Sequence, residues 1–228
     1  MNVQKKGKFI VIEGIDSCGK GTQLNLLSKR INNLGKKILT ADFPRYYSSE
    51  WGKMVGQFLT GKFGRFDVID PHLAVLPYMI DQYTWARDIG FPWLKKGGNI
   101  ILDRYFTSNV HQVAKSKTVA KKKYREWLWP MGYKELGILM PDLVLFLNVS
   151  PLVTKKLIKT KEDRGYLKGR KKDNAEKNWK HQWAAYREYL YMTKNEESWI
   201  SIKCMAKGRI EQPEVIHERV WKKASGIL

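Results

Sequence analysis

Cysteine is scarce in this chain, with Cys18 and Cys204 as the two examples in 228 residues. Two cysteines cannot build a disulfide framework, and they are too few for a cysteine-rich metal cluster. The composition therefore excludes a small secreted domain held together by disulfides. It favours a reducing compartment, and we expect the protein to be cytoplasmic.

Long hydrophobic runs are also missing. No apolar segment approaches the roughly 18 residues that a membrane helix needs. The apolar stretch at residues 9–12 is closed by Glu13 and is too short for the core of a secretory signal. We expect no membrane partner. At about 150 residues per domain, the length predicts one domain over residues 1–228, or one domain with an insert.

Acidic residues are few: 22 Asp and Glu stand against 42 Lys and Arg, which leaves a net charge of +20. Such an excess favours polyanionic partners, but nucleic acids and phosphorylated small molecules both qualify. The 43% of apolar residues are enough for a sizeable core, which excludes a wholly disordered chain.

Short apolar runs alternate with longer segments of helical spacing. This alternation predicts an α/β fold in which helices cover both faces of a parallel sheet. We expect the runs to be buried strands, at Phe9–Glu13, Lys37–Ala41, Asn99–Leu102, Leu143–Val149 and Trp199–Cys204.

The helical segments show apolar faces and end signals. In the first, Leu24, Leu27, Ile31 and Leu34 share one face, and Gly35 is a suitable left-handed cap. We expect the last helical segment to start near Pro213 and to bury Ile216 and Val220, which lie one turn apart. A further segment has large apolar residues at helical spacing, and we expect them in the core: Trp179, Trp183, Tyr186 and Leu190.

A glycine-rich segment lies directly between the first strand and the first helix. Glycines allow backbone N–H groups to point inward around phosphate oxygens, and the helix N-terminus adds its positive end. Lys20 would reach the transferring phosphate as a mobile charge, whereas a chance glycine turn is the alternative. The expected ATP-binding residues are Gly14, Ile15, Asp16, Ser17, Cys18, Gly19, Lys20, Gly21 and Thr22.

Gly21 stands where this kind of loop normally has a hydroxyl that ligates Mg²⁺. We therefore expect the metal to be held through its own waters and phosphate oxygens, with Thr22 as a further candidate ligand. Cys18 lies near a helix N-terminus, where a thiol pKa tends to fall, but we interpret it as a small residue that fits the loop.

A second pair of charged residues follows the third predicted strand. Parallel strands bring their carboxyl ends to one edge of the sheet, so Asp103 and Arg104 are expected beside the glycine loop. Asp103 could order a water bound to Mg²⁺ or accept a proton, and Arg104 could bridge two phosphates. The alternative is a helix-capping aspartate with an arginine at the surface.

Two basic stretches stand apart from this pattern. Lys115–Arg125 holds six basic residues and no acid, and we expect it to be a solvated surface. Lys155–Lys180 holds eleven basic and four acidic residues around Gly165 and Gly169. Its glycines favour a mobile segment, although a solvated charge run is the alternative.

Several motifs follow one another in a characteristic order and spacing: residues 9–16, Gly19–Gln23, Phe43-Pro44-Arg45, Asp103-Arg104-Tyr105 with Ser108-Asn109, and residues 141–147. Through these motifs the chain resembles the thymidylate kinase family along nearly its whole length. The resemblance implies a P-loop NTPase fold, a three-layer α/β/α sandwich with a five-stranded parallel sheet, and a homodimer. Gly19–Gln23 also resembles the loop of adenylate kinases.

The resemblance also implies an acceptor site for dTMP. Asp16 would meet the sugar 3′-hydroxyl, Arg45 and Arg104 would hold the phosphate, and an aromatic side chain would stack on thymine. Gln82 stands where many members have arginine, and His111-Gln112 replace an aromatic that crowds out a ribose 2′-hydroxyl. The implied dTMP-binding residues are Asp16, Phe43, Arg45, Tyr78, Gln82, Arg104, Ser108, Asn109, Gln112 and Tyr166.

Some members of the family supply a catalytic arginine from a lid that closes over ATP, and this glycine loop has no arginine. The implied lid covers about residues 160–176, with Arg164 and Arg170 as candidates for spreading charge on the transferring phosphoryl group. We expect the catalytic residues to be Lys20, Asp103, Arg104, Arg164 and Arg170.

The implied reaction is ATP + dTMP → ADP + dTDP with Mg²⁺, by direct in-line transfer. One alternative is a nucleoside monophosphate kinase with a different or broader acceptor such as dUMP or AMP. A nucleic-acid-binding P-loop ATPase is a second alternative. The charge supports it, but the sequence shows no recognised nucleic-acid motif, so we do not expect nucleic acid as a partner.

Overall fold

The computed structural model describes residues 6–64, 68–116, 119–158 and 179–228. Within these ranges, five parallel strands form one sheet in the order β2-β3-β1-β4-β5. Each predicted strand is present to within one residue at either end, which confirms the α/β fold. The strands are β1 (Phe9–Glu13), β2 (Ile38–Asp42), β3 (Asn99–Asp103), β4 (Leu143–Asn148) and β5 (Trp199–Lys203).

The sheet is most deeply buried at its centre. All five residues of β1 are buried, because β1 lies between β3 and β4 and both of its faces are covered. Strand β2 was also predicted to be buried, and this is wrong: its residues are partly or fully exposed. It is one of the two edge strands of the sheet. The other, β5, was likewise predicted to be buried and is only partly so, because a strand's place in the order is not encoded in its own apolar run.

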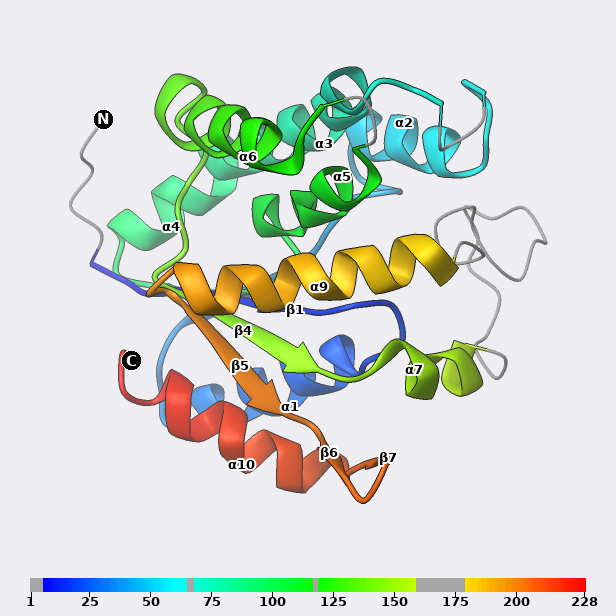
Figure 1. Ribbon diagram of the computed structural model, residues 1–228. Coiled ribbons are helices and arrows are strands. Elements are labelled where there is room, and N and C mark those ends of the chain that lie inside the picture. The colour runs from blue at the N-terminus through cyan, green and yellow to red at the C-terminus, as the bar shows by residue number, and fades with distance from the viewer. Residues whose placement is uncertain (1–5, 65–67, 117–118, 159–178) are drawn as a thin grey trace.

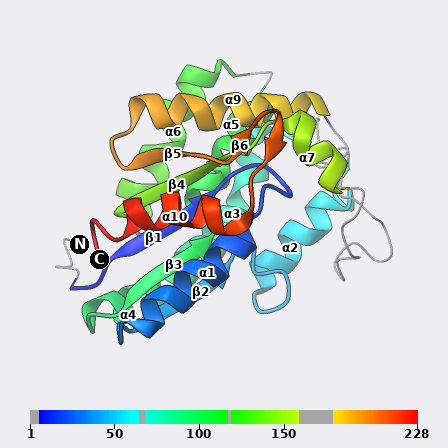
Figure 2. The same ribbon diagram turned by 90° about the horizontal axis from the view of Figure 1, so that it is seen from below.

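Helices cover both faces of the sheet, as predicted. Figure 1 shows α1 (Lys20–Asn33) and α10 (Pro213–Ala224) below the sheet, with α3 (Pro71–Trp85), α5 (Val110–Lys115) and α9 (Trp179–Asn195) above it. The view from below shows α1 and α10 as neighbours on the lower face (Figure 2). The result is a three-layer α/β/α sandwich.

The remaining elements are short or lie at the periphery. A hairpin of two-residue strands was not predicted, since strands of this length show no periodicity. Among the described residues, no helix has the length and apolar character to cross a membrane. These elements are α2 (Glu50–Leu59), α4 (Phe91–Lys95), α6 (Lys121–Pro130), α7 (Pro151–Ile158), π-helical turns at Ala86–Gly90 and Met131–Glu135, a 3₁₀ turn at Phe106–Asn109, and the hairpin strands β6 (Met205–Ala206) and β7 (Arg209–Ile210).

The apolar faces of the first and last helices were mostly predicted correctly. Ile216 and Val220 of α10 are buried, and Gly35 has the expected positive φ of 71°. Leu34 was expected on the buried face of α1 but is 58% exposed. The helix ends at Asn33, so the chain turns away before Leu34 reaches the core.

The buried face of α9 differs from the predicted aromatic row. Trp183 and Tyr186 are only partly buried, whereas His181, Gln182 and Tyr189 are fully buried. Tyr189 stacks on Phe146 of β4 with ring centroids 5.0 Å apart. Helix α9 therefore turns a polar face toward the carboxyl ends of the strands.

Candidate functional site

The glycine loop connects β1 to α1, in the predicted strand–loop–helix arrangement. Gly14 and Gly19 have φ values of 153° and 94°, which suit glycine. A Cβ atom on Gly14 would lie 2.6 Å from Sγ of Cys18 and 3.2 Å from the carbonyl oxygen of Leu147. The loop therefore packs tightly against β4, and glycine at position 14 is required for this approach.

Lys20 begins α1, and its ammonium group turns back toward the loop. Nζ donates a hydrogen bond to the carbonyl oxygen of Ile15 at 3.2 Å, and the residue is buried. The carboxylate of Asp103 borders the same turn, since a Cβ on Gly21 would lie 3.7 Å from its Oδ2 atom. The loop and the end of β3 therefore lie together at one edge of the sheet.

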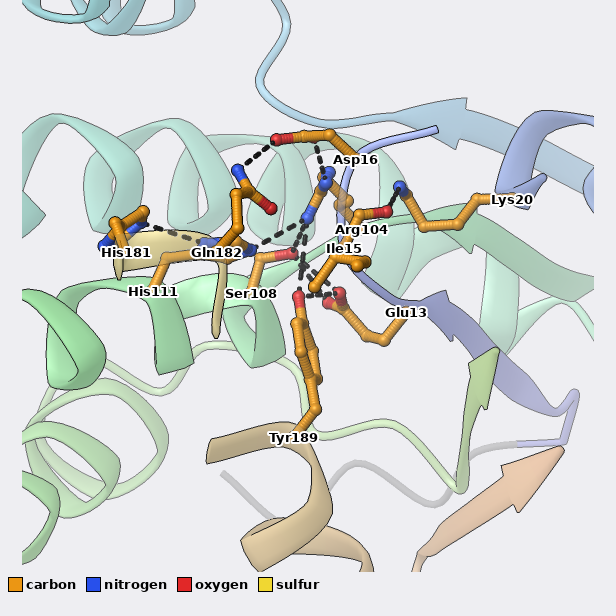
Figure 3. A network of polar contacts seen from close by, with 10 residues as sticks. All are labelled: Glu13, Ile15, Asp16, Lys20, Arg104, Ser108, His111, His181, Gln182 and Tyr189. Carbon is orange, nitrogen blue, oxygen red and sulfur yellow. Dashed lines mark hydrogen bonds and ion pairs between the residues drawn. The ribbon is translucent and has the colours of Figure 1, made fainter. Parts of the chain in front are cut away.

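Arg104 links the two segments directly. Its Nη2 atom lies 2.6 Å from Oδ1 of Asp16, and both side chains are largely buried. Its Nη1 atom lies 3.4 Å from Ser108 Oγ, His111 Nε2 and Tyr189 Oη (Figure 3). Burial opposes the charged form, but the surrounding negative groups, above all Asp16, keep the pKa of Arg104 well above its usual value.

Glu13, at the end of β1, anchors the network from below. Its carboxylate is fully buried and accepts hydrogen bonds from Thr107 Oγ1 at 2.6 Å, Ser108 Oγ at 2.8 Å and Tyr189 Oη at 2.8 Å. Burial raises its pKa. The sequence motifs do not assign Glu13 to the site, although an acid that closes an apolar strand is a signal for such a role.

Helix α9 contributes residues that the sequence did not predict. Gln182 Nε2 donates to Oδ2 of Asp16 at 3.0 Å, and Nε2 of His181 lies 3.3 Å from Nδ1 of His111. Gln182 points from α9 toward Asp16 of the loop, whereas His181 points toward His111 (Figure 3). The sequence prediction for this segment rests on its aromatic spacing. It therefore does not identify the buried polar residues His181 and Gln182, which precede Trp183.

Arg45 is held against α3 rather than left at the surface. Its Nε atom donates to Asp81 Oδ1 at 3.0 Å, and Nη2 donates to the carbonyl oxygen of Asp81 at 2.8 Å and to Thr84 Oγ1 at 3.0 Å. Phe43, two residues earlier, is buried and packs edge-to-face on Trp85. The segment is thereby fixed on α3, and Asp81 is a supporting residue that we did not predict.

The residues expected to recognise a base come together between α3 and the turn after β3. Gln82 and Asn109 are both buried, and Nδ2 of Asn109 lies 3.4 Å from Oε1 of Gln82. Tyr78 is partly buried against Phe58 of α2, with ring centroids 6.4 Å apart. Gln112 is buried as well, and its Oε1 atom has no hydrogen-bond partner among the described residues.

Carboxylates at two neighbouring strand ends offer oxygen ligands for a cation. Asp42 and Asp103 are in register on β2 and β3, and loss of solvent together with the charge of Asp103 raises the pKa of Asp42. Thr22 is exposed in the first turn of α1. Within the described ranges, no group of three acidic, histidine or cysteine side chains could hold a metal alone. This donor set fits Mg²⁺ that keeps its waters and binds phosphates.

Two expectations about individual residues are resolved by burial. Cys18 is buried and its pKa is raised by burial, so it is a packing residue rather than a reactive thiolate. The stretch Lys115–Arg125 is not simply solvated, because Lys115 is buried with Nζ 5.0 Å from the Phe58 ring, and Arg125 bonds to Glu188 of α9 at 2.6 Å.

The lid at residues 160–176, with Arg164, Tyr166 and Arg170, lies outside the described residues.

The parallel sheet and the glycine loop around Lys20, set between a strand and a helix, define a P-loop protein. A family model described as thymidylate kinase matches residues 12–213. The chain belongs to the thymidylate kinase family.

Individual relatives agree with this assignment. A thymidylate kinase of Arabidopsis thaliana is 33% identical over 66% of this chain and 52% of its own length, and one of Schizosaccharomyces pombe is 30% identical over 67% and 66%. The chain therefore spans between half and two thirds of these relatives. The solved thymidylate kinase of Candida albicans superposes with a TM-score of 0.68 at 21% identity, over 96% of this chain and 92% of that one, and supports the fold.

Proposed function

We propose that the protein transfers the γ-phosphoryl group of ATP to dTMP, giving ADP and dTDP with Mg²⁺ as cofactor. One observation carries this proposal: the loop around Lys20 and the Asp103–Arg104 pair lie together, joined by the 2.6 Å contact between Arg104 and Asp16. Two phosphorylated ligands can meet at such a site only if phosphate-binding groups converge from both segments. Membership in the thymidylate kinase family supports the choice of dTMP.

The donor side consists of the loop at residues 14–22. We assign Lys20 to the transferring phosphate, because its buried ammonium bonds to a backbone carbonyl of the loop that a phosphate oxygen could replace. The buried Ser17 Oγ atom in this loop has no hydrogen-bond partner among the described residues. Direct transfer needs no protein nucleophile, and positioning and charge neutralisation supply most of the acceleration.

The acceptor side lies between α3 and the turn after β3. Arg45 and Arg104 would hold the acceptor phosphate, Tyr78 would stack on the base, and Gln82 and Asn109 would bond to its edge. The support is spatial: Arg45 is anchored on the same helix as Gln82, and Asn109 contacts Gln82.

Mg²⁺ would bind near Asp103, with Thr22 close by and phosphate oxygens as its other ligands. When bound, it neutralises charge on the phosphates during transfer. We assign to Asp103 the orientation of metal-bound water, and to the lid at about residues 160–176 the closure over ATP with Arg164 or Arg170. We further propose that residues 1–228 form a single domain with this lid.

A broader acceptor range is the second candidate, and Gln82 favours it. A glutamine offers both a donor and an acceptor without charge, so it can satisfy more than one base edge. The test is a panel of dTMP, dUMP and AMP, each offered with ATP and Mg²⁺, with ADP release as readout. We expect release to depend on the monophosphate and to be fastest with dTMP.

Equal ADP release with and without any monophosphate would contradict the kinase proposal. A salt-dependent DNA-binding assay on the same sample tests the alternative of a nucleic-acid-dependent ATPase. Stimulation of ATP hydrolysis by DNA, without stimulation by dTMP, would favour that alternative.

We also propose that the protein is a cytoplasmic homodimer. Helices α2 and α3 pack together and leave large apolar side chains exposed, with Leu73 65% and Leu76 44% exposed on α3 and Trp51 and Met54 each 36% exposed on α2. Burying such side chains against a second copy would remove apolar surface from water. Light scattering coupled to size exclusion measures the mass directly.

Both cysteines are unpaired, consistent with a reducing compartment.

A further inference from the structure

Two histidines lie in line behind Arg104 and have no part in the proposed reaction. His111 of α5 places Nε2 3.4 Å from Nη1 of Arg104 and Nδ1 3.3 Å from Nε2 of His181, on α9. The three side chains form a row that leads away from Asp16 (Figure 3). The row joins three segments that are distant in sequence.

The donor and acceptor chemistry of this row favours one arrangement of protons. Arginine can only donate, so Nε2 of His111 must be the bare, accepting nitrogen. The proton of His111 then lies on Nδ1 and donates to Nε2 of His181, which must also be bare. In this arrangement both rings are neutral, with the remaining proton on Nδ1 of His181.

The electrostatic surroundings also favour neutral rings. Burial, and then the charge of Arg104, holds the pKa of His111 well below its usual value, and burial lowers that of His181 to about 4. The charged groups that face the pair are Asp16 from the loop, Arg104 from the turn after β3, Lys20 from α1, Lys115 from α5 and Lys121 from α6. Four of these five groups are cationic, which disfavours a further positive charge.

We propose that His111, with its tautomer set by His181, is a positioning residue that orients the Arg104 guanidinium for the acceptor phosphate. The inference rests on the proposed function. Asp16 already offsets part of the charge of Arg104 on the Nη2 side. A second carboxylate on the Nη1 side would offset more of it, whereas a neutral imidazole fixes the direction of the guanidinium and leaves its charge available to a phosphate.

Kinetics of two substitutions test this inference. His111→Leu removes the acceptor, and we expect kcat/KM for dTMP to fall about tenfold, the low end for a hydrogen bond to a charged group because the contact is long. His111→Gln retains an accepting oxygen and should remain within about threefold of the wild type. His217→Leu, on a buried histidine of α10 outside the site, is the matched control and should leave kcat/KM unchanged.

A double-substitution cycle separates positioning from a general structural effect. In an Arg104→Lys background, His111→Leu should cause no further loss, because the group on which His111 acts has been removed. Additive losses would overturn the proposal, as would equal losses for His111→Leu and His111→Gln.

A spectroscopic measurement on the free wild-type protein tests the same point without activity. Long-range ¹H–¹⁵N NMR distinguishes a protonated ring nitrogen from a bare one, and we expect bare Nε2 atoms on both histidines at pH 7. An imidazolium or a protonated Nε2 on His111 would refute the proposal even if His111→Leu fails to fold. Absence of dTMP-dependent ADP release by the wild type would instead refute the proposed function.

Discussion

Removal of one hydroxyl from Tyr189 tests how the buried acid of the site is stabilised. Tyr189 Oη donates to the fully buried carboxylate of Glu13 at 2.8 Å, while the ring stacks on Phe146. Tyr189→Phe keeps the ring and creates almost no cavity, so its effect is mainly that of the hydrogen bond. Bonds to charged groups contribute about 1.5–3 kcal/mol each, and we expect the free energy of unfolding to fall by about that amount at a pH where Glu13 is ionised.

The expected loss depends on pH, because burial raises the pKa of Glu13 in the folded protein above its usual value of 4.5. Between the two values the folded protein binds more protons than the unfolded chain, so stability falls as the pH rises through this window. The Tyr189 hydroxyl favours the ionised form. The cost of Tyr189→Phe should therefore be larger above the folded pKa, where Glu13 is charged, than below it.

Urea unfolding followed by circular dichroism, at pH values from 4 to 8, measures both effects. Tyr186→Phe is the matched control on the same helix: its hydroxyl donates to Asn148 Oδ1 at 2.7 Å in a partly exposed position. That neutral bond should contribute only about 0.5–1.5 kcal/mol, with little dependence on pH. Equal losses for the two variants throughout this pH range, or a pH-independent loss for Tyr189→Phe, would refute the reasoning.

Three further substitutions test other parts of the site. Lys20→Ala should leave a folded protein whose kcat for dTMP phosphorylation is lower by orders of magnitude, and near-normal turnover in the ADP-release assay would contradict its assigned role. Arg164→Ala or Arg170→Ala should lower kcat more than dTMP affinity, and the lid assignment is wrong if both changes are silent. Gly52→Ala places a Cβ 2.2 Å from the carbonyl oxygen of Arg45, so α2 must shift. Thermal unfolding should show a loss of about 1–3 kcal/mol, and an unchanged melting temperature would contradict this close packing.

The local elements of the fold were predictable because their signals are local. The run Phe9–Glu13 is apolar at four successive positions, and all of its residues are buried in the centre of the sheet. Gly35 has the expected positive φ because a left-handed residue ends the helix there. The edge position of β2 was not predictable, since exposure of a strand depends on its neighbours and not on its own side chains.

The candidate site was predictable where a motif carries it and not where packing supplies it. The glycines around Lys20 and the pair Asp103–Arg104 follow strands directly, so the parallel sheet brings them to one edge. Asp81 gave no such signal, because its carboxylate joins the site only through Arg45. The burial of Lys115 was likewise unpredictable, since it depends on Phe58 from a different helix.

The sequence by itself determined the alternation of strands and helices, the phosphate-binding loop and the edge of the sheet at which charged residues meet. Each of these follows from the spacing of apolar residues, glycines and charges over short stretches of chain. Only the tertiary structure decided that α9 presents Gln182 and Tyr189 to Asp16 and Glu13, and that His111 lies between Arg104 and His181. The physical reason is that hydrogen bonds between distant segments depend on how the helices pack on the sheet, and short-range patterns carry no record of that packing.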